Sequence, residues 1–211
     1  MTQPHFRQAI IEYIRAEANP PDKFSHQPRL FALACQLAGA QLFDEDVVFA
    51  AAWLHDLGVF IGHRPEDPKA LAAWDNVGYA LKRVPPLLRE FQFPASKIPA
   101  VVEAIRTHLP SREPTSFEAT LLRDADILEQ LGAVGILRAV SKIGRDTRFS
   151  VFGDVLRVLR RNAVELPGNL KLESARALAG PRLKVLNDFL AAAALETEKS
   201  ADARQPKRTR S

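Results

Sequence analysis

Two ionisable side chains stand next to each other in an otherwise apolar stretch of the chain. His55 and Asp56 follow the apolar residues 50–54, and Gly58 comes two positions later. Burying an imidazole and a carboxylate is costly unless they pair with each other or bind a metal ion. Successive helical residues point about 100° apart, so both side chains can reach one ion at the edge of the helix. The dipeptide therefore indicates a metal site.

A second histidine and a second aspartate extend this donor set. His26 lies near the start of a predicted helix, and Asp126 lies in an apolar helical segment. Two neutral imidazoles and two carboxylates suit manganese, iron, magnesium, cobalt or nickel. Because the set has no thiolate and two carboxylates, it does not demand zinc. We therefore expect one divalent ion, held by His26, His55, Asp56 and Asp126.

The elements that must position these donors are all predicted to be helical. Apolar residues recur at helical spacing along most of the chain, without a strand pair or an internal repeat. Asp44 is suited to cap the helix that carries His55, and Pro85-Pro86 is expected to break the chain. The sequence thus predicts an all-α, single-domain helical bundle. Its helices are expected at about 6–18, 23–40, 45–56, 69–83, 96–107, 115–132, 133–144, 149–164 and 171–197.

Composition narrows the class of protein. Of 211 residues, 46% are hydrophobic, which is enough to enclose a substantial core. No apolar run approaches the roughly 20 residues that cross a bilayer, and the first residues do not resemble a secretory signal. The single cysteine, Cys35, excludes an intrachain disulfide and suits a reducing compartment. We therefore expect a cytoplasmic protein that does not associate with membranes.

The net charge of +4 belongs to the end of the chain. Residues 199–211 hold five basic side chains and one acidic side chain, which leaves 24 of each sign in residues 1–198. We therefore expect the domain to span residues 1–198 and residues 199–211 to form a basic, disordered tail. Because the domain is balanced in charge, nucleic-acid binding is not expected as its primary role.

The order of these donors resembles that of the HD-domain superfamily of metal-dependent phosphohydrolases. That signature reads His…His-Asp…Asp on a bundle of helices, and the narrower resemblance is to small single-domain predicted phosphohydrolases of bacteria. The segments that carry it are His26-Gln27-Pro28-Arg29-Leu30, Leu54-His55-Asp56, Ile105-Arg106-Thr107-His108, the run from Asp124 to Ala133, and the closing segments 175–182 and 187–190.

The resemblance also bears on which aspartate completes the site. Asp124 and Asp126 are two residues apart, so on a helix they point about 200° apart and cannot both face one ion. The superfamily's Ala-Asp-x-Leu element matches residues 125–128, which favours Asp126. Asp124 is then expected to orient a ligand histidine.

The superfamily implies hydrolysis of a phosphoester or phosphoanhydride, and the expected substrate is a nucleotide. A bound divalent ion would polarise the phosphoryl oxygen and lower the pKa of a bound water. Many members carry a carboxylate three residues after the His-Asp aspartate, where this chain has Val59. The remaining candidates for proton transfer are Asp56, His63 and His108. The cations expected to bind the substrate phosphate are Arg29, Arg64 and Arg106.

Two other functions remain open at this point. The missing carboxylate at Val59 favours a catalytically silent HD domain that binds a nucleotide or a metal as a sensor or partner module. If His63 and His108 instead hold a second ion, a di-iron site for oxidative cleavage becomes available, as in a minority of the superfamily. A homo-oligomer is compatible with either function.

Overall fold

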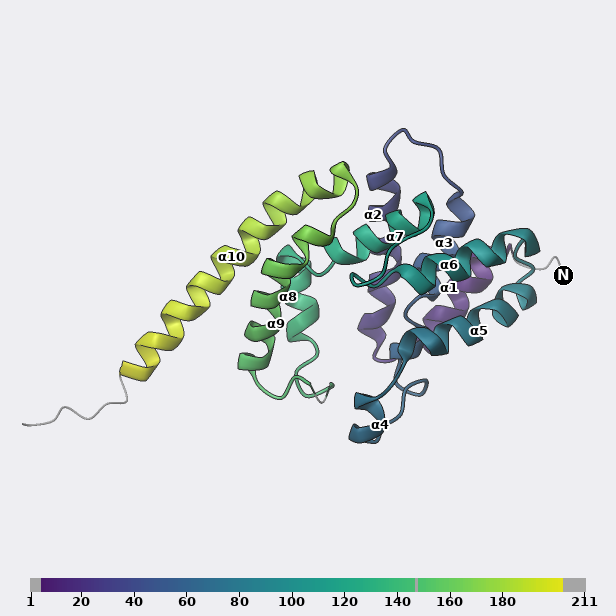
Figure 1. Ribbon diagram of the computed structural model, residues 1–211. Helices are drawn as coiled ribbons and strands as arrows, with labels where there is room; N and C mark the ends of the chain where they lie inside the picture. The colour runs from purple at the N-terminus through teal and green to yellow at the C-terminus, as the bar shows by residue number, and fades with distance from the viewer. Residues whose placement is uncertain (1–4, 147, 203–211) are drawn as a thin grey trace, which may run out of the picture. The chain divides into compact units, whose positions relative to one another are not determined.

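A computed structural model describes residues 5–146 and 148–202 (Figure 1). Over these residues it contains ten α-helices, four short 3₁₀ helices and no strand, which confirms the predicted all-α class. The α-helices are α1 (Phe6–Glu17), α2 (His26–Ala38), α3 (Glu45–Leu54), α4 (Pro68–Ala72), α5 (Asn76–Glu90), α6 (Ile98–Thr107), α7 (Phe117–Leu128), α8 (Gly132–Val140), α9 (Phe152–Glu165) and α10 (Glu173–Asp202); the 3₁₀ helices are η1 (Pro21–Ser25), η2 (Leu57–Val59), η3 (Ala95–Lys97) and η4 (Pro167–Asn169).

The chain forms two compact units. The first comprises residues 1–127 and 169–176, and the second comprises residues 128–168 and 177–211. A single domain over residues 1–198 stays a prediction. Helix α10 continues to Asp202, past the predicted start of the tail, and residues 203–211 lie outside the described part of the chain.

Helix α3 forms the centre of the first unit. It packs against α1, α2 and α6, and all its residues from Val47 to Leu54 are buried. A helix that is apolar on every side belongs in a core. The Asp44 carboxylate accepts hydrogen bonds from the backbone N–H groups of Asp46 and Val47, at 3.1 and 3.2 Å, which confirms the predicted cap.

The end of α3 differs from the prediction. The helix stops at Leu54, two residues early: His55 keeps helical dihedral angles, but Asp56 has φ −96° and ψ 14°. The chain then turns into η2, against which α5 packs. A Cβ atom on Gly58 would lie 2.6 Å from the Cα atom of Asn76, so only glycine allows this close approach. The dipeptide therefore terminates the helix, and the residues after it rest on α5.

The predicted helix over 69–83 is divided. It forms α4 and α5, and the carboxylate of Asp75 caps the second piece by accepting a hydrogen bond from the Gly78 N–H at 2.8 Å. Helix α4 has no buried residue and stands apart from the other helices of its unit in Figure 1. The carboxylate cap at Asp75 lets a new helix start where the periodicity alone suggested continuity.

The predicted break at Pro85-Pro86 is wrong. Helix α5 runs through both prolines to Glu90. Val84, Leu87 and Leu88 are buried around them, whereas Pro86 is exposed. Burial of these three apolar side chains favours an unbroken helix, and carbonyl groups left without N–H donors on the exposed side can bond to water.

The second unit pairs α8 with α9 and contains most of α10. Gly132 begins α8 with φ +69°, and a Cβ atom there would lie 3.1 Å from the side chain of Arg182. The Arg182 Nη1 donates a hydrogen bond to the Leu128 carbonyl at 2.7 Å. All the predicted site residues lie in the first unit. Among the described residues, no helix is long and apolar enough to cross a membrane.

Candidate metal centre

Four of the predicted site residues come together in the first unit. One donor atom from each of His26, His55 and Asp56 lies within 4.8 Å of the other two. The His26 Nε2 atom is 3.9 Å from Asp56 Oδ2 and 3.5 Å from Asp126 Oδ1, and the His55 Nε2 atom is 3.5 Å from Asp56 Oδ1. The first and last of these donors, His26 and Asp126, are 100 positions apart in the sequence, and the fold brings them together.

The C-terminal ends of three helices carry residues that lie in the cluster or beside it. His55 caps the C-terminus of α3, and His108 caps that of α6. Asp126 lies two residues before the end of α7. The C-terminal end of a helix carries a partial negative charge that favours a nearby cation. His26 is the first residue of α2, because the turn before it forms η1 instead of the predicted start of the α-helix.

The hydrogen bond that the His55 ring makes leaves the lone pair of its Nε2 atom directed at an Asp56 oxygen, which is also an acceptor. The His55 Nδ1–H donates to the Ala52 carbonyl at 3.0 Å, because a carbonyl oxygen can only accept. His55 is 1% exposed, and burial lowers the pKa of its imidazole to about 4. At neutral pH its Nε2 atom therefore carries no proton, and it faces an Asp56 oxygen that is also an acceptor.

Asp56 is ionised in this arrangement. Burial works to raise the pKa of its carboxyl group, but the imidazoles of His55 and His26 outweigh burial and lower that pKa to about 2. Lone pairs on nitrogen and oxygen that converge in a buried place need a cation between them. The donor atoms, their burial and their spacing fit a divalent metal ion.

His108 lies beside the cluster. Its ring centroid is 5.1 Å from that of His55, at an interplanar angle of 73°, and its side chain is almost fully buried. The His108 Nδ1–H donates to the Ile105 carbonyl at 2.6 Å. This bond fixes the ring and keeps Nε2 available to accept a proton or to bind an ion.

Asp124 and Asp126 have different surroundings. Asp126 faces His26, as described above. Asp124 is fully buried and accepts hydrogen bonds from the backbone N–H groups of Lys171 and Leu172, at 2.9 and 2.7 Å. Burial raises the pKa of Asp124 despite these bonds. The expected role of Asp124 in orienting a histidine is therefore wrong: it anchors the segment at residues 171–172 instead.

His63 does not join the cluster through its ring nitrogens. Its Nδ1 lies 2.8 Å from the Leu57 carbonyl oxygen, and its Nε2 lies 2.6 Å from a carboxylate oxygen of Glu17. Both nitrogens are therefore engaged, which leaves none for a second ion. No pattern in the sequence linked Glu17 to His63, because the two residues are 46 positions apart.

The candidate phosphate-binding cations have different environments. Arg29 is half-buried on α2, one turn after His26, and Arg64 is half-buried beyond η2. Arg106 is exposed on α6, and its Nη1 donates to Glu103 at 2.5 Å. Lys23 on η1 is also basic, and its charge helps to lower the pKa of Asp56. Lys23 is thus a further cation close to the cluster.

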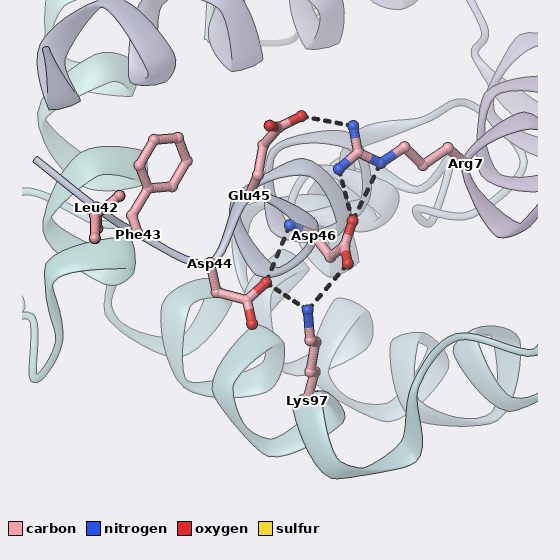
Figure 2. A pocket seen from close by; sticks show the side chains of 7 residues that line it. All are labelled: Arg7, Leu42, Phe43, Asp44, Glu45, Asp46 and Lys97. Carbon is pink, nitrogen blue, oxygen red and sulfur yellow. Dashed lines mark hydrogen bonds and ion pairs between the residues drawn. The ribbon is translucent and has the colours of Figure 1, made fainter. Parts of the chain in front are cut away.

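Figure 2 shows a pocket at the opposite end of α3. There Arg7 binds Glu45 and Asp46, at 2.7 and 2.6 Å, and Lys97 binds Asp44 and Asp46, at 2.9 and 3.0 Å. Each carboxylate in this pocket therefore has a cationic partner at contact distance. Because these charges already neutralise each other, the pocket does not need a metal ion. The candidate metal centre lies at the C-terminal end of α3.

Comparison with solved structures found similar folds in bacterial proteins. A protein named a predicted HD superfamily hydrolase, from an uncultured Thermotogales bacterium, is 27% identical with a TM-score of 0.62, over 92% of this chain and 93% of the other. An HD-superfamily hydrolase from Bacillus thuringiensis is 20% identical with a TM-score of 0.63, over 94% and 97%. YpgQ from Bacillus subtilis, in complex with ADP, is 22% identical with a TM-score of 0.67, over 94% and 97%.

Comparisons with models of protein families and with curated proteins found no match. The structural neighbours include HD-superfamily hydrolases, so the predicted resemblance to that superfamily and to its small bacterial branch is confirmed. They support a hydrolase family for this chain, and the cluster of His26, His55 and Asp56 supports a divalent metal site within it.

Proposed function

We propose that the protein is a divalent-metal-dependent phosphohydrolase that acts on a nucleotide phosphoester or phosphoanhydride. The observation that carries this proposal is the 3.5 Å gap between two hydrogen-bond acceptors, Nε2 of the buried His55 and Oδ1 of the half-buried Asp56. Such a gap suits an ion, and HD-superfamily neighbours share the fold. The nucleotide is favoured because one neighbour was crystallised with ADP.

His26, His55, Asp56 and Asp126 would hold one ion, of manganese, iron, magnesium, cobalt or nickel. When bound, the ion polarises a phosphoryl oxygen and lowers the pKa of a coordinated water. The side chains of Lys23 and Arg29 are suited to contact the phosphate, since both lie within one turn of His26. Arg64 is a further candidate, whereas Arg106 is already paired with Glu103.

Hydrolysis joins the water oxygen to phosphorus, breaks the bond from phosphorus to the leaving oxygen, and moves one proton from the water to the leaving group. His108 is suited to relay this proton, because its Nδ1–H is fixed on the Ile105 carbonyl and its ring lies 5.1 Å from that of His55. Asp56 is the other candidate base. We give His63 no role in proton transfer, because both its nitrogens are engaged.

A second candidate function is a catalytically silent module that binds a nucleotide or a metal. The observation in its favour is Val59, which supplies no carboxylate where many superfamily members have one. A di-iron oxygenase is less well supported, since the His63 ring is held by Glu17 and Leu57.

A phosphate-release screen separates the two functions. Metal-stripped protein is assayed on nucleotides, pyrophosphate and simple phosphoesters, with manganese, magnesium, cobalt, nickel or iron added back. Release that depends on metal and is lost in Asp56→Asn supports the phosphohydrolase. Stoichiometric metal binding without release from any substrate would instead favour the sensor.

A further inference from the structure

The ring of His63 lies between two hydrogen-bond acceptors. Its Nδ1 is 2.8 Å from the Leu57 carbonyl oxygen, and its Nε2 is 2.6 Å from Glu17 Oε2. A neutral imidazole has only one N–H, so it cannot donate to both. A ring that carries a proton on each nitrogen can donate to both, and the Glu17 carboxylate would then balance its charge.

The first of these acceptors belongs to the residue directly after Asp56. Asp56 has left the helical conformation, so the hydrogen bonds of α3 no longer fix the chain there. One local backbone bond, from the Val59 N–H to the Asp56 carbonyl at 3.0 Å, and two distant side chains do so instead: His63 binds the Leu57 carbonyl, and the Trp74 Nε1–H donates to the Gly58 carbonyl at 2.8 Å. The position of the Asp56 carboxylate thus depends on residues outside the metal cluster.

We infer that Glu17 and His63 form a charged pair that positions Asp56 for metal binding. Glu17 stabilises the doubly protonated ring, and the ring holds the Leu57 carbonyl in place. The ring of Tyr79, whose centroid is 5.5 Å from that of His63, packs beside it and restricts its movement. This inference rests on the proposed metal-dependent function, and it makes His63 and Glu17 positioning residues.

The protonation of His63 can be measured without metal or substrate. Nitrogen-15 NMR of the histidine rings in the metal-free protein at neutral pH is expected to show both nitrogens of His63 protonated. In Glu17→Gln the second acceptor becomes an amide oxygen without charge, and the ring is expected to become neutral. Glu12→Gln is the matched control, because Glu12 lies on the same helix, is exposed, and accepts a hydrogen bond from the Gln8 side chain.

The effect on the site is measured by titration with Co²⁺, followed by its absorption spectrum. Glu17→Gln and His63→Gln are each expected to weaken Co²⁺ binding about tenfold, the lower range for outer partners of a metal site. The double variant is expected to bind no more weakly than His63→Gln alone, because the two residues act as a unit. Glu12→Gln should bind Co²⁺ as the unchanged protein does.

A neutral His63 ring in the unchanged protein would overturn the inference. So would unaltered Co²⁺ affinity in folded Glu17→Gln, judged by circular dichroism. These results are independent of the phosphate-release screen: a protein that releases no phosphate but shows both the charged ring and the weakened Co²⁺ binding would refute the proposed reaction and keep the positioning role.

Discussion

The two ends of α3 hold similar side chains in opposite arrangements. At the N-terminal end, Asp46 meets Arg7 and Lys97 at 2.6 and 3.0 Å, and all three side chains are about 30% exposed (Figure 2). At the C-terminal end, the acceptor atoms of the buried His55 and the half-buried Asp56 face each other at 3.5 Å. At the N-terminal end, cationic side chains neutralise the carboxylate. At the C-terminal end, a bound metal ion would do so.

This difference teaches that the shape of a surface does not by itself identify a site. The hollow at the N-terminal end is lined by residues that already satisfy one another, and such exposed ion pairs contribute little free energy. At the other end, the demand for a cation comes from burial and from lone pairs that converge.

The largest expected effect is a difference between the two ends of α3 when one carboxylate charge is removed at each end. Asp56→Asn should lower metal-dependent phosphate release by about a thousandfold or more, because a metal ion supplies several kcal/mol of transition-state stabilisation. Asp46→Asn makes the same chemical change at the paired end and should leave the rate within about twofold. Initial rates at saturating Mn²⁺ test this. Equal losses in both variants would show that the two ends do not differ as described.

The neighbouring aspartates of α7 sharpen the distinction between binding a metal and holding the fold. Asp124→Ala leaves the buried N–H groups of Lys171 and Leu172 without an acceptor, and should lower the free energy of unfolding by about 3 kcal/mol. Asp126→Ala should lower it far less while abolishing tight Co²⁺ binding. Urea denaturation and Co²⁺ titration of both variants check this. The reverse pattern would make Asp124 the ligand.

The third effect depends on pH. Burial lowers the pKa of His55 from 6.5 to about 4, so between these values the unfolded chain holds a proton that the folded protein lacks. Stability therefore falls as the pH falls through this window, by about 2 kcal/mol from pH 7 to pH 5 in the metal-free protein. Asp56, with a folded pKa near 2, does not titrate there.

Urea denaturation at pH 5, 6 and 7 measures this slope. His55→Gln should remove most of it, whereas His5→Gln, which changes an exposed histidine before α1, should leave it intact. If the slope persists unchanged in His55→Gln, the buried imidazole is not its source.

The smallest effect is expected at the N-terminal end of α3, where the carboxylates are paired with Arg7 and Lys97. Hydrogen bonds to Asp44 and Asp46 raise the pKa of Lys97, but the side chains are partly exposed. Lys97→Met should therefore lower the free energy of unfolding by only about 0.5–1 kcal/mol, and most of this loss should vanish in 1 M NaCl. Co²⁺ affinity should not change. A loss of affinity would mean that the two ends of α3 are coupled.

Sequence patterns predicted the helical class and most helices because those features are local. The Asp44 cap and the span of α1 follow from neighbouring residues. The continuation of α5 through Pro85-Pro86 does not, since it depends on burial of Val84, Leu87 and Leu88 in the folded protein. The early end of α3 likewise depends on the approach of Asn76 to Gly58.

For the candidate site, the residue types and their order predicted the four donors that the fold brings together. The role of each donor as a ligand stays a prediction. The partner of His63 could not be predicted, because an ion pair between residues 17 and 63 leaves no periodic trace in the sequence. The same holds for Asp124, whose carboxylate accepts hydrogen bonds from the backbone N–H groups of residues 171 and 172.

The contact between Gly58 and Asn76 limits how this protein can be redesigned. Because the first turn of α5 sits against a residue without a side chain, α5 cannot be exchanged for a foreign helix unless the new backbone follows the same path. Randomised libraries aimed at a new substrate should hold position 58 constant. Substitutions are better placed in α4, none of whose residues is buried.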